Sequence, residues 1–124
     1  MRTQRNYPLT LWTAQDLDSG GTLTTNAIAC WERFPDVLMF RVTNASADAD
    51  VKIEVAFSND GVNFNNYTSQ DALTTSTATV YATQNPEEYH ALIVPSAPWI
   101  KLKITELASA NNNVVDATLW LREL

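Results

Sequence analysis

The sequence contains one cysteine, one histidine and three glycines, and it has no long apolar run. A single cysteine excludes an internal disulfide, and a single histidine excludes a histidine-rich metal site or a multi-histidine catalytic centre. No apolar stretch approaches the roughly eighteen residues that a membrane-spanning helix needs. The N-terminus lacks the apolar segment of a secretory signal, so we expect a protein made in the cytoplasm, where its thiol stays reduced.

Basic residues are also scarce and scattered. The chain has 8 basic and 14 acidic residues, a formal net charge of −6 and no lysine or arginine cluster. This pattern argues against a surface that binds the phosphate backbone of nucleic acid. Hydrophobic residues make up 45% of the 124 positions, which argues against disorder and is enough for the core of one domain.

The composition and the spacing of apolar residues favour β-structure. The chain has 15 threonines, which favour strands, and 11 asparagines, which favour turns. Short alternating runs predict strands at 9–14, 23–30, 37–43, 51–58, 63–68, 77–82, 89–94, 99–107 and 114–122. We therefore expect an all-β fold. It would be a single antiparallel β-sandwich over 9–124, jelly-roll-like or immunoglobulin-like, after an N-terminal arm over 1–8.

Alternation is clearest at 51–58, where every second residue is apolar. The same pattern in the last two predicted strands completes an expected core of Val51, Ile53, Val55, Phe57, Ile100, Leu102, Ile104, Leu119 and Leu121. The dipeptide Asp60-Gly61 predicts a tight hairpin, because its turn needs positive φ values that glycine adopts readily. We expect the return strand to start at 62–64.

The candidate chemical groups form neither a metal site nor a catalytic set. The segment 16–21 resembles a calcium loop, but position twelve of an EF-hand loop would be Ala27 rather than glutamate. We interpret it as a glycine-rich turn, with an irregular calcium site as the alternative. His90 has acidic neighbours, but no serine or cysteine stands in a nucleophile motif. The sequence predicts no catalytic residue, no metal and no cofactor.

The aromatic residues carry more information. Trp12, Trp99 and Trp120 fall on the more polar faces of their predicted strands, where exposed rings would mark a contact surface. The alternative is that bends or bulges return these rings to the core. Trp99 and Trp120 are expected on neighbouring strands, sharing one outer face, because a short asparagine-rich connection joins their segments. Cys30, beside Trp31 in an apolar stretch, is expected to be a small core residue.

The order of these motifs resembles a known class of protein. The hairpin at 57–64, the strand at 98–105, the asparagine-rich turn at 111–113 and the closing strand at 115–122 are similar to small β-sandwich virion proteins of tailed bacteriophages. These include head decoration (cement) proteins and tail or fibre modules. The resemblance implies a non-enzymatic capsid decoration protein. It would form a homo-oligomer, expected to be a trimer, that binds across subunits of the major capsid protein in the virion, after assembly in the host cytoplasm.

On this hypothesis the arm with Arg2 and Arg5 orders against a neighbouring subunit, and Trp12, Trp99 and Trp120 are the other interface candidates. The alternative is a carbohydrate-binding or receptor-binding β-sandwich module of a tail or fibre, with the same tryptophans as platforms for sugar rings. A weaker alternative is an intracellular adaptor domain. None of these roles involves nucleic acid or a membrane. Solution mass separates the first two, since a trimer or larger ring favours the capsid role.

Overall fold

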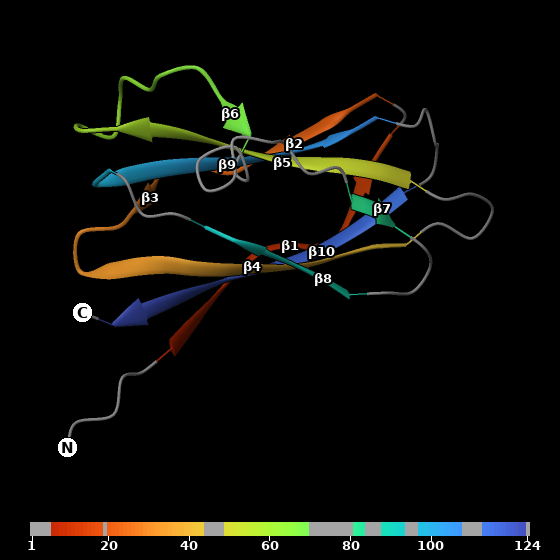
Figure 1. Cartoon of the computed structure of the whole chain (residues 1–124), viewed down its shortest axis with the longest axis horizontal. Coiled ribbons are helices and arrows are strands. Elements are labelled where there is room, and N and C mark those ends of the chain that lie inside the picture. The colour runs from red at the N-terminus through yellow and green to blue at the C-terminus, as the bar shows by residue number, and fades with distance from the viewer. Residues whose placement is uncertain are drawn as a thin grey trace.

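The computed structural model describes residues 6–18, 20–43, 49–69, 81–83, 88–93, 97–107 and 113–123. In these residues the chain forms two antiparallel β-sheets that face each other across a shared core, which confirms the predicted β-sandwich (Figure 1). The described part of the chain contains no helix.

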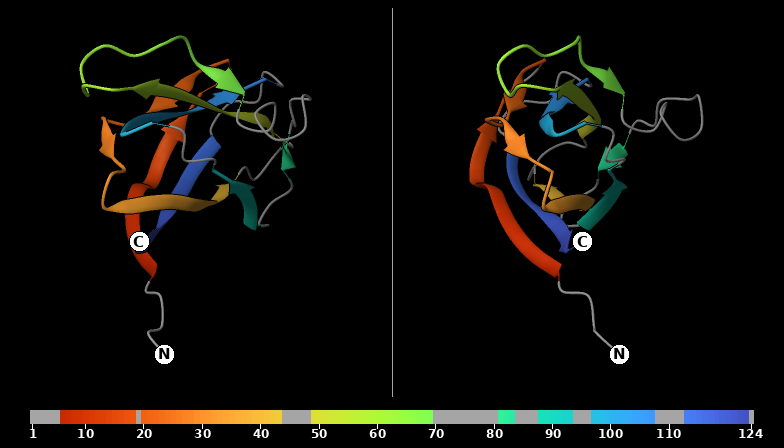
Figure 2. Two further views of the ribbon diagram at one scale, coloured as in Figure 1. Left: turned by 60° about the vertical axis from the view of Figure 1, so that its left-hand side comes forward. Right: turned by 90° about the vertical axis from the view of Figure 1, so that its left-hand side faces the viewer.

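Strands from distant parts of the chain alternate within each sheet. Sheet A has the order β1-β10-β4-β8, which are Asn6–Leu17, Asn113–Glu123, Arg33–Thr43 and Glu88–Leu92. Sheet B has the order β2-β9-β5-β6, which are Thr22–Thr24, Trp99–Glu106, Ala49–Ser58 and Thr68–Ser69. In addition, β3 (Ile28–Ala29) pairs with β9, and β7 (Tyr81–Thr83) pairs with β5. The first and last strands, β1 and β10, lie side by side (Figure 2).

The first strand starts earlier than the sequence predicts. β1 begins at Asn6, and its residue Pro8 lies opposite Trp120 of β10. Residues 6–8 therefore belong to sheet A rather than to an arm. The ring of Tyr7 explains this, because it packs against the core and lies 3.7 Å from the guanidinium carbon of Arg33. The remaining arm residues 1–5, which include Arg2 and Arg5, lie outside the described residues.

The core contains the residues that alternation predicts. Eight of the nine expected residues are buried, and the ninth, Phe57, is half-buried and packs against the same cluster. The register between β5 and β9 places Val55 opposite Leu102 and Phe57 opposite Ile100, so apolar faces of neighbouring strands coincide. Because a slip of one residue would turn every apolar side chain to solvent, this alternation also determines the register.

The segment after β5 differs from the predicted hairpin. β5 ends at Ser58, and strand pairing resumes only at Thr68 of β6. Between them, the Asp60 carboxylate accepts hydrogen bonds from the backbone N–H groups of Val62 and Asn63, both at 2.8 Å. These bonds hold the pKa of the Asp60 carboxyl well below its usual range, so the group is charged and the turn is stabilised by a side chain.

The prediction that a return strand starts at 62–64 is wrong, because these residues are not part of a strand. Two aromatic side chains of this segment instead contact lysines of β9. The Phe64 ring centroid lies 4.5 Å from Nζ of Lys101, and the Tyr67 ring centroid lies 4.6 Å from Nζ of Lys103. Both lysines belong to the outward face of β9. Cation–π contacts therefore hold this segment against the outer face of sheet B.

Gly61 has a φ of 77°, as predicted, and a Cβ added there would lie 2.9 Å from Cε2 of Trp99. Gly61→Ala is expected to lower the free energy of unfolding by more than about 1 kcal/mol, since the left-handed backbone alone costs that much. Gly20→Ala is the matched control, because Gly20 has a φ of 66° but no atom within 4 Å of the added Cβ. Urea unfolding of both variants measures the difference. Equal losses would show that the Trp99 ring yields to the methyl group.

Cys30 is the small core residue that the sequence predicts. Its side chain is 2% exposed, and burial raises the pKa of the thiol to about 11. Because the thiolate is the reactive form, iodoacetamide at about pH 8 is expected to label the folded protein very slowly and the urea-unfolded protein rapidly. Mass spectrometry of timed samples measures both rates. Rapid labelling of the folded chain would contradict the burial.

Asp16 and Leu17 end β1, and the described residues Asp18, Gly20 and Gly21 belong to the turn that leads to β2. The Gly21 N–H donates a hydrogen bond to the Asp18 carbonyl at 2.9 Å, and Gly20 takes the positive φ of the turn. The Gly20 N–H also donates to Oε2 of the buried Glu106 at 2.9 Å. These contacts agree with the interpretation as a glycine-rich turn. Among the described residues, no cluster of three or more His, Cys, Asp or Glu is arranged to hold a metal ion.

Candidate functional site

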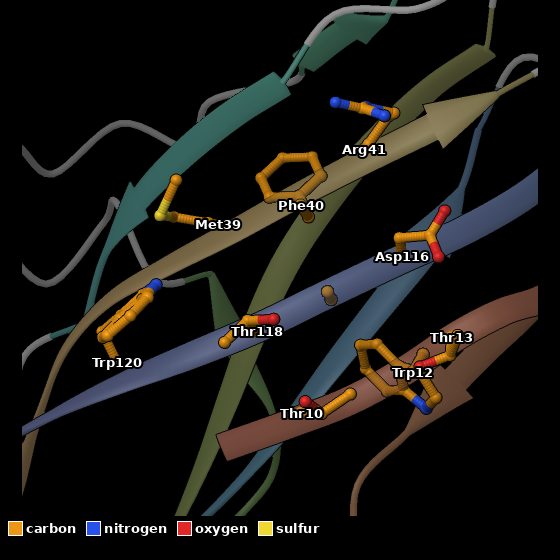
Figure 3. Close-up of a pocket in the computed structure, with 10 residues that line it drawn as sticks. Thr10, Trp12, Thr13, Met39, Phe40, Arg41, Asp116, Thr118 and Trp120 are labelled. Atoms are coloured by element: carbon orange, nitrogen blue, oxygen red, sulfur yellow. The ribbon is translucent and has the colours of Figure 1, made fainter. Parts of the chain in front are cut away.

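A pocket of about 430 Å³ lies on the outer face of sheet A. Three neighbouring strands, β1, β10 and β4, supply its lining residues Thr10, Trp12, Thr13, Met39, Phe40, Arg41, Asp116, Ala117, Thr118 and Trp120 (Figure 3). The volume lies within the range of about 300–1,000 Å³ that is usual for small-molecule sites.

Strand alternation explains how the pocket receives its side chains. On β10, Asp116, Thr118 and Trp120 alternate with fully buried residues, so they face away from the core. Thr118 lies opposite Thr10 of β1 on one side and opposite Met39 of β4 on the other. Cross-strand neighbours of this kind lie about 4.5–5.5 Å apart at Cβ and form a continuous surface. Trp120 lies on the outward face of its strand, as alternation predicts, but its ring is half-buried rather than fully exposed.

Trp12 reaches the pocket in a different way from the one that alternation predicts. Thr10 lies opposite Thr118, whereas Trp12 lies opposite Ala117, so β1 contains one extra residue between them. An inserted residue shifts the alternation of the strand. Leu11 and Trp12 consequently both pack against the core. The expected position of Trp12 on the outward, polar face of its strand is therefore wrong, and Trp12 is half-buried between the core and the pocket.

A second bulge follows at once, and Asp116 holds it in place. Ala14 has a φ of 47°, which residues other than glycine rarely adopt. The Ala14 N–H donates a hydrogen bond of 2.9 Å to Oδ1 of Asp116. This bond joins the irregular part of β1 to β10 beside the pocket. Asp116 thereby positions the strand that carries Trp12.

The pocket combines flat apolar groups with polar ones. Figure 3 shows Trp120 and Trp12 toward opposite ends of the pocket, with Thr118 between them. The thioether of Met39 adds apolar surface. The polar groups are three hydroxyls, a carboxylate and a guanidinium, which come from Thr10, Thr13, Thr118, Asp116 and Arg41. Such a surface suits a ligand that has both an apolar face and hydroxyl groups.

Comparison with known proteins gives similarity of structure only. No family model and no curated protein matches the chain. The chain is similar to the native structure of a family 35 carbohydrate binding module from Clostridium thermocellum, with a TM-score of 0.50 and 15% identity over 95% of this chain and 90% of that chain. It also matches the CBM22-1 xylan-binding domain from Paenibacillus barcinonensis Xyn10C, with a TM-score of 0.44 and 15% identity over 98% and 85%. At such identity, the first similarity shows the fold.

The third predicted tryptophan lies elsewhere. Trp99 begins β9 of sheet B, whereas Trp120 lies on β10 of sheet A, so the prediction that they share one outer face is wrong. The connection after β9 crosses between the sheets, and turn residues alone do not specify which sheet the next strand joins. Instead, the Trp99 ring contacts Trp31, with centroids 4.8 Å apart and planes at 77°.

Three residues of the pocket and of the Trp31–Trp99 contact were not among the residues predicted from the sequence. Met39 and Arg41 alternate with buried residues inside β4, which was the available signal for an outward face. Trp31 follows the buried Cys30 in an apolar stretch, which favours burial, yet it is 56% exposed. It lies in the connection between β3 of sheet B and β4 of sheet A, where alternation does not apply.

The described residues form no helix, so none of them forms one long and apolar enough to cross a bilayer. His90 lies on β8, where it pairs with Met39 of β4 in the backbone register. Its neighbour Glu87 lies outside the described residues.

Proposed function

We propose that the protein is a carbohydrate-binding β-sandwich module whose sugar site is the pocket on sheet A. The observation that carries the proposal is the placement of two half-buried indoles, Trp12 and Trp120, toward opposite ends of a pocket with hydroxyl and charged groups between them. A sugar ring has the complementary chemistry. Its C–H groups form an apolar face, and its hydroxyls surround the edge.

Each group has a defined role. The face of an indole ring carries negative charge density, which attracts the weakly positive C–H groups of a sugar lying on it. We assign that platform to Trp120, which points out of β10. The hydroxyls of Thr10 and Thr118 can each donate and accept a hydrogen bond. Asp116 already accepts the Ala14 N–H at Oδ1, and its Oδ2 is the acceptor for a sugar hydroxyl.

The fold is compatible with carbohydrate binding, but it is not the main argument for this proposal. The family 35 module, which covers nearly the whole chain in structure, is named as carbohydrate binding. Because one fold hosts many functions, the weight rests on the side chains of the pocket. The proposal assigns binding and no catalysis.

Tryptophan fluorescence during titration with glycans tests the proposal. The probes are hexasaccharides of β-1,4-linked xylose, glucose and mannose, together with sedimentation on insoluble xylan, cellulose and mannan. A saturable change with one of them, or specific co-sedimentation, supports the proposal. No change with any soluble probe and no co-sedimentation with any solid would overturn it for these sugar classes.

The virion role stays a prediction that rests on the resemblance. The homotrimer, the major capsid protein as partner and the location in the virion belong to it. Glycan binding is compatible with its tail or fibre form, since a receptor-binding module recognises host glycans. Solution mass checks the oligomer, and co-sedimentation with particles from the source checks the partner.

A further inference from the structure

We infer that Trp31 and Trp99 form a second sugar platform, separate from the pocket and specific for an uncharged sugar ring. The inference rests on the proposed function and extends it from one contact site to two. Trp31 is 56% exposed and stands in the connection between the sheets, whereas the pocket lies on the outer face of sheet A.

The platform is rigid. The Trp31 ring meets Trp99 edge to face, with centroids 4.8 Å apart. The Trp99 ring in turn packs closely on the backbone of Gly61. The contact is so close that a Cβ added to Gly61 would lie only 2.9 Å from the Trp99 ring. The Cys30 N–H donates a hydrogen bond of 2.7 Å to the Pro98 carbonyl, so the residues preceding both tryptophans are joined as well. A ring oriented before binding loses little conformational freedom when a ligand lies on it.

The size of the surface selects a small ligand. A fully covered tryptophan buries about 150–250 Å², so the open part of Trp31 offers roughly 100 Å². A stable protein–protein interface needs about 800 Å² from each partner. Val62, which follows Gly61, is 79% exposed but adds only a small side chain. The apolar area therefore fits one sugar ring and is too small for the core of a protein interface.

Charge selects the kind of sugar. Glu32 follows Trp31 and is exposed, and the exposed Asp60 precedes Gly61. The Asp60 carboxylate is held ionised by the hydrogen bonds of its turn, including one from Ser58 Oγ at 2.9 Å. These two carboxylates, one on the residue after Trp31 and one on the residue before Gly61, disfavour an anionic ligand on a chain of net charge −6. An uncharged pyranose is the ligand that remains favourable.

The indole N–H resonances of the four tryptophans provide the test. The probes are the same three hexasaccharides, and Trp31→Ala and Trp120→Ala assign their own signals by removing them. We expect both signals to shift saturably in the parent. In Trp120→Ala, the midpoint for Trp31 should change by less than about twofold, since the two sites share no residue. If Trp31→Ala does not fold, Trp31→Phe replaces it, because phenylalanine retains a ring but removes the indole N–H signal.

Each outcome decides between the two proposals. Shifts at Trp120 alone would overturn the second platform and leave the proposed function standing. Shifts at Trp31 alone would support the platform and overturn the pocket as the sugar site. A Trp31 shift that depends on protein concentration without sugar would show contact between copies of the chain and overturn the platform. No shift at either ring with any probe would overturn both.

Discussion

Val55→Asp is expected to unfold the protein at neutral pH. Val55 is 0% exposed, lies opposite Leu102 of β9 and belongs to the core cluster. A carboxylate there would lose its hydration without gaining a partner, which costs several kcal/mol, while whole domains are stable by about 5–15 kcal/mol. Circular dichroism and a thermal melt measure the result. A soluble variant with a cooperative melt would contradict the assignment of Val55 to the core.

Val62→Asp is the matched control, because it makes the same chemical change at a residue that is 79% exposed. We expect its free energy of unfolding to stay within about 0.5 kcal/mol of the parent. Val55→Ala provides a graded variant that still folds, with an expected loss of about 2 kcal/mol. Losses of similar size in Val62→Asp and Val55→Asp would point to charge repulsion rather than burial.

Trp120→Ala is expected to abolish most glycan binding and to leave the fold intact. The indole lies on the outer face of sheet A, half-buried, so its truncation opens no cavity in the core. Truncation of an aromatic residue at the centre of a binding site often costs about 2 kcal/mol or more, which is about thirtyfold in affinity. Fluorescence titration or calorimetry with the best hexasaccharide measures the loss. Unchanged affinity in a folded variant would remove Trp120 from the sugar site.

Two variants separate ring stacking from general apolar contact. Trp120→Phe keeps a flat ring and should retain more affinity than Trp120→Ala. Leu107→Ala removes an apolar side chain that is 45% exposed and does not line the pocket, so it should bind like the parent. Loss of solution mass in Trp120→Ala, with glycan binding retained, would instead support the predicted oligomer interface. Unfolding of Trp120→Ala would show that the ring supports the core.

Within the strands, the sequence by itself determined most of the local structure. The alternation in β5 and β9 predicted the residues that meet between the sheets, because a period of two allows only one face to be buried. The positive φ of Gly61 and the burial of Cys30 followed from equally local chemistry. The outward position of Trp120 on β10 belongs to the same class of prediction.

The tertiary structure alone decided which tryptophans share a surface. The first bulge in β1 turned Trp12 toward the core, because one inserted residue reverses the side chains that follow it up to the next bulge, and it leaves no mark in composition. The crossing after β9 placed Trp99 on the other sheet from Trp120. The ring contact between Trp31 and Trp99 likewise depends on tertiary packing, because the two residues are distant in sequence. Alternation describes a strand relative to its own two faces, whereas a binding surface depends on which strands and loops become neighbours, and only long-range pairing specifies that.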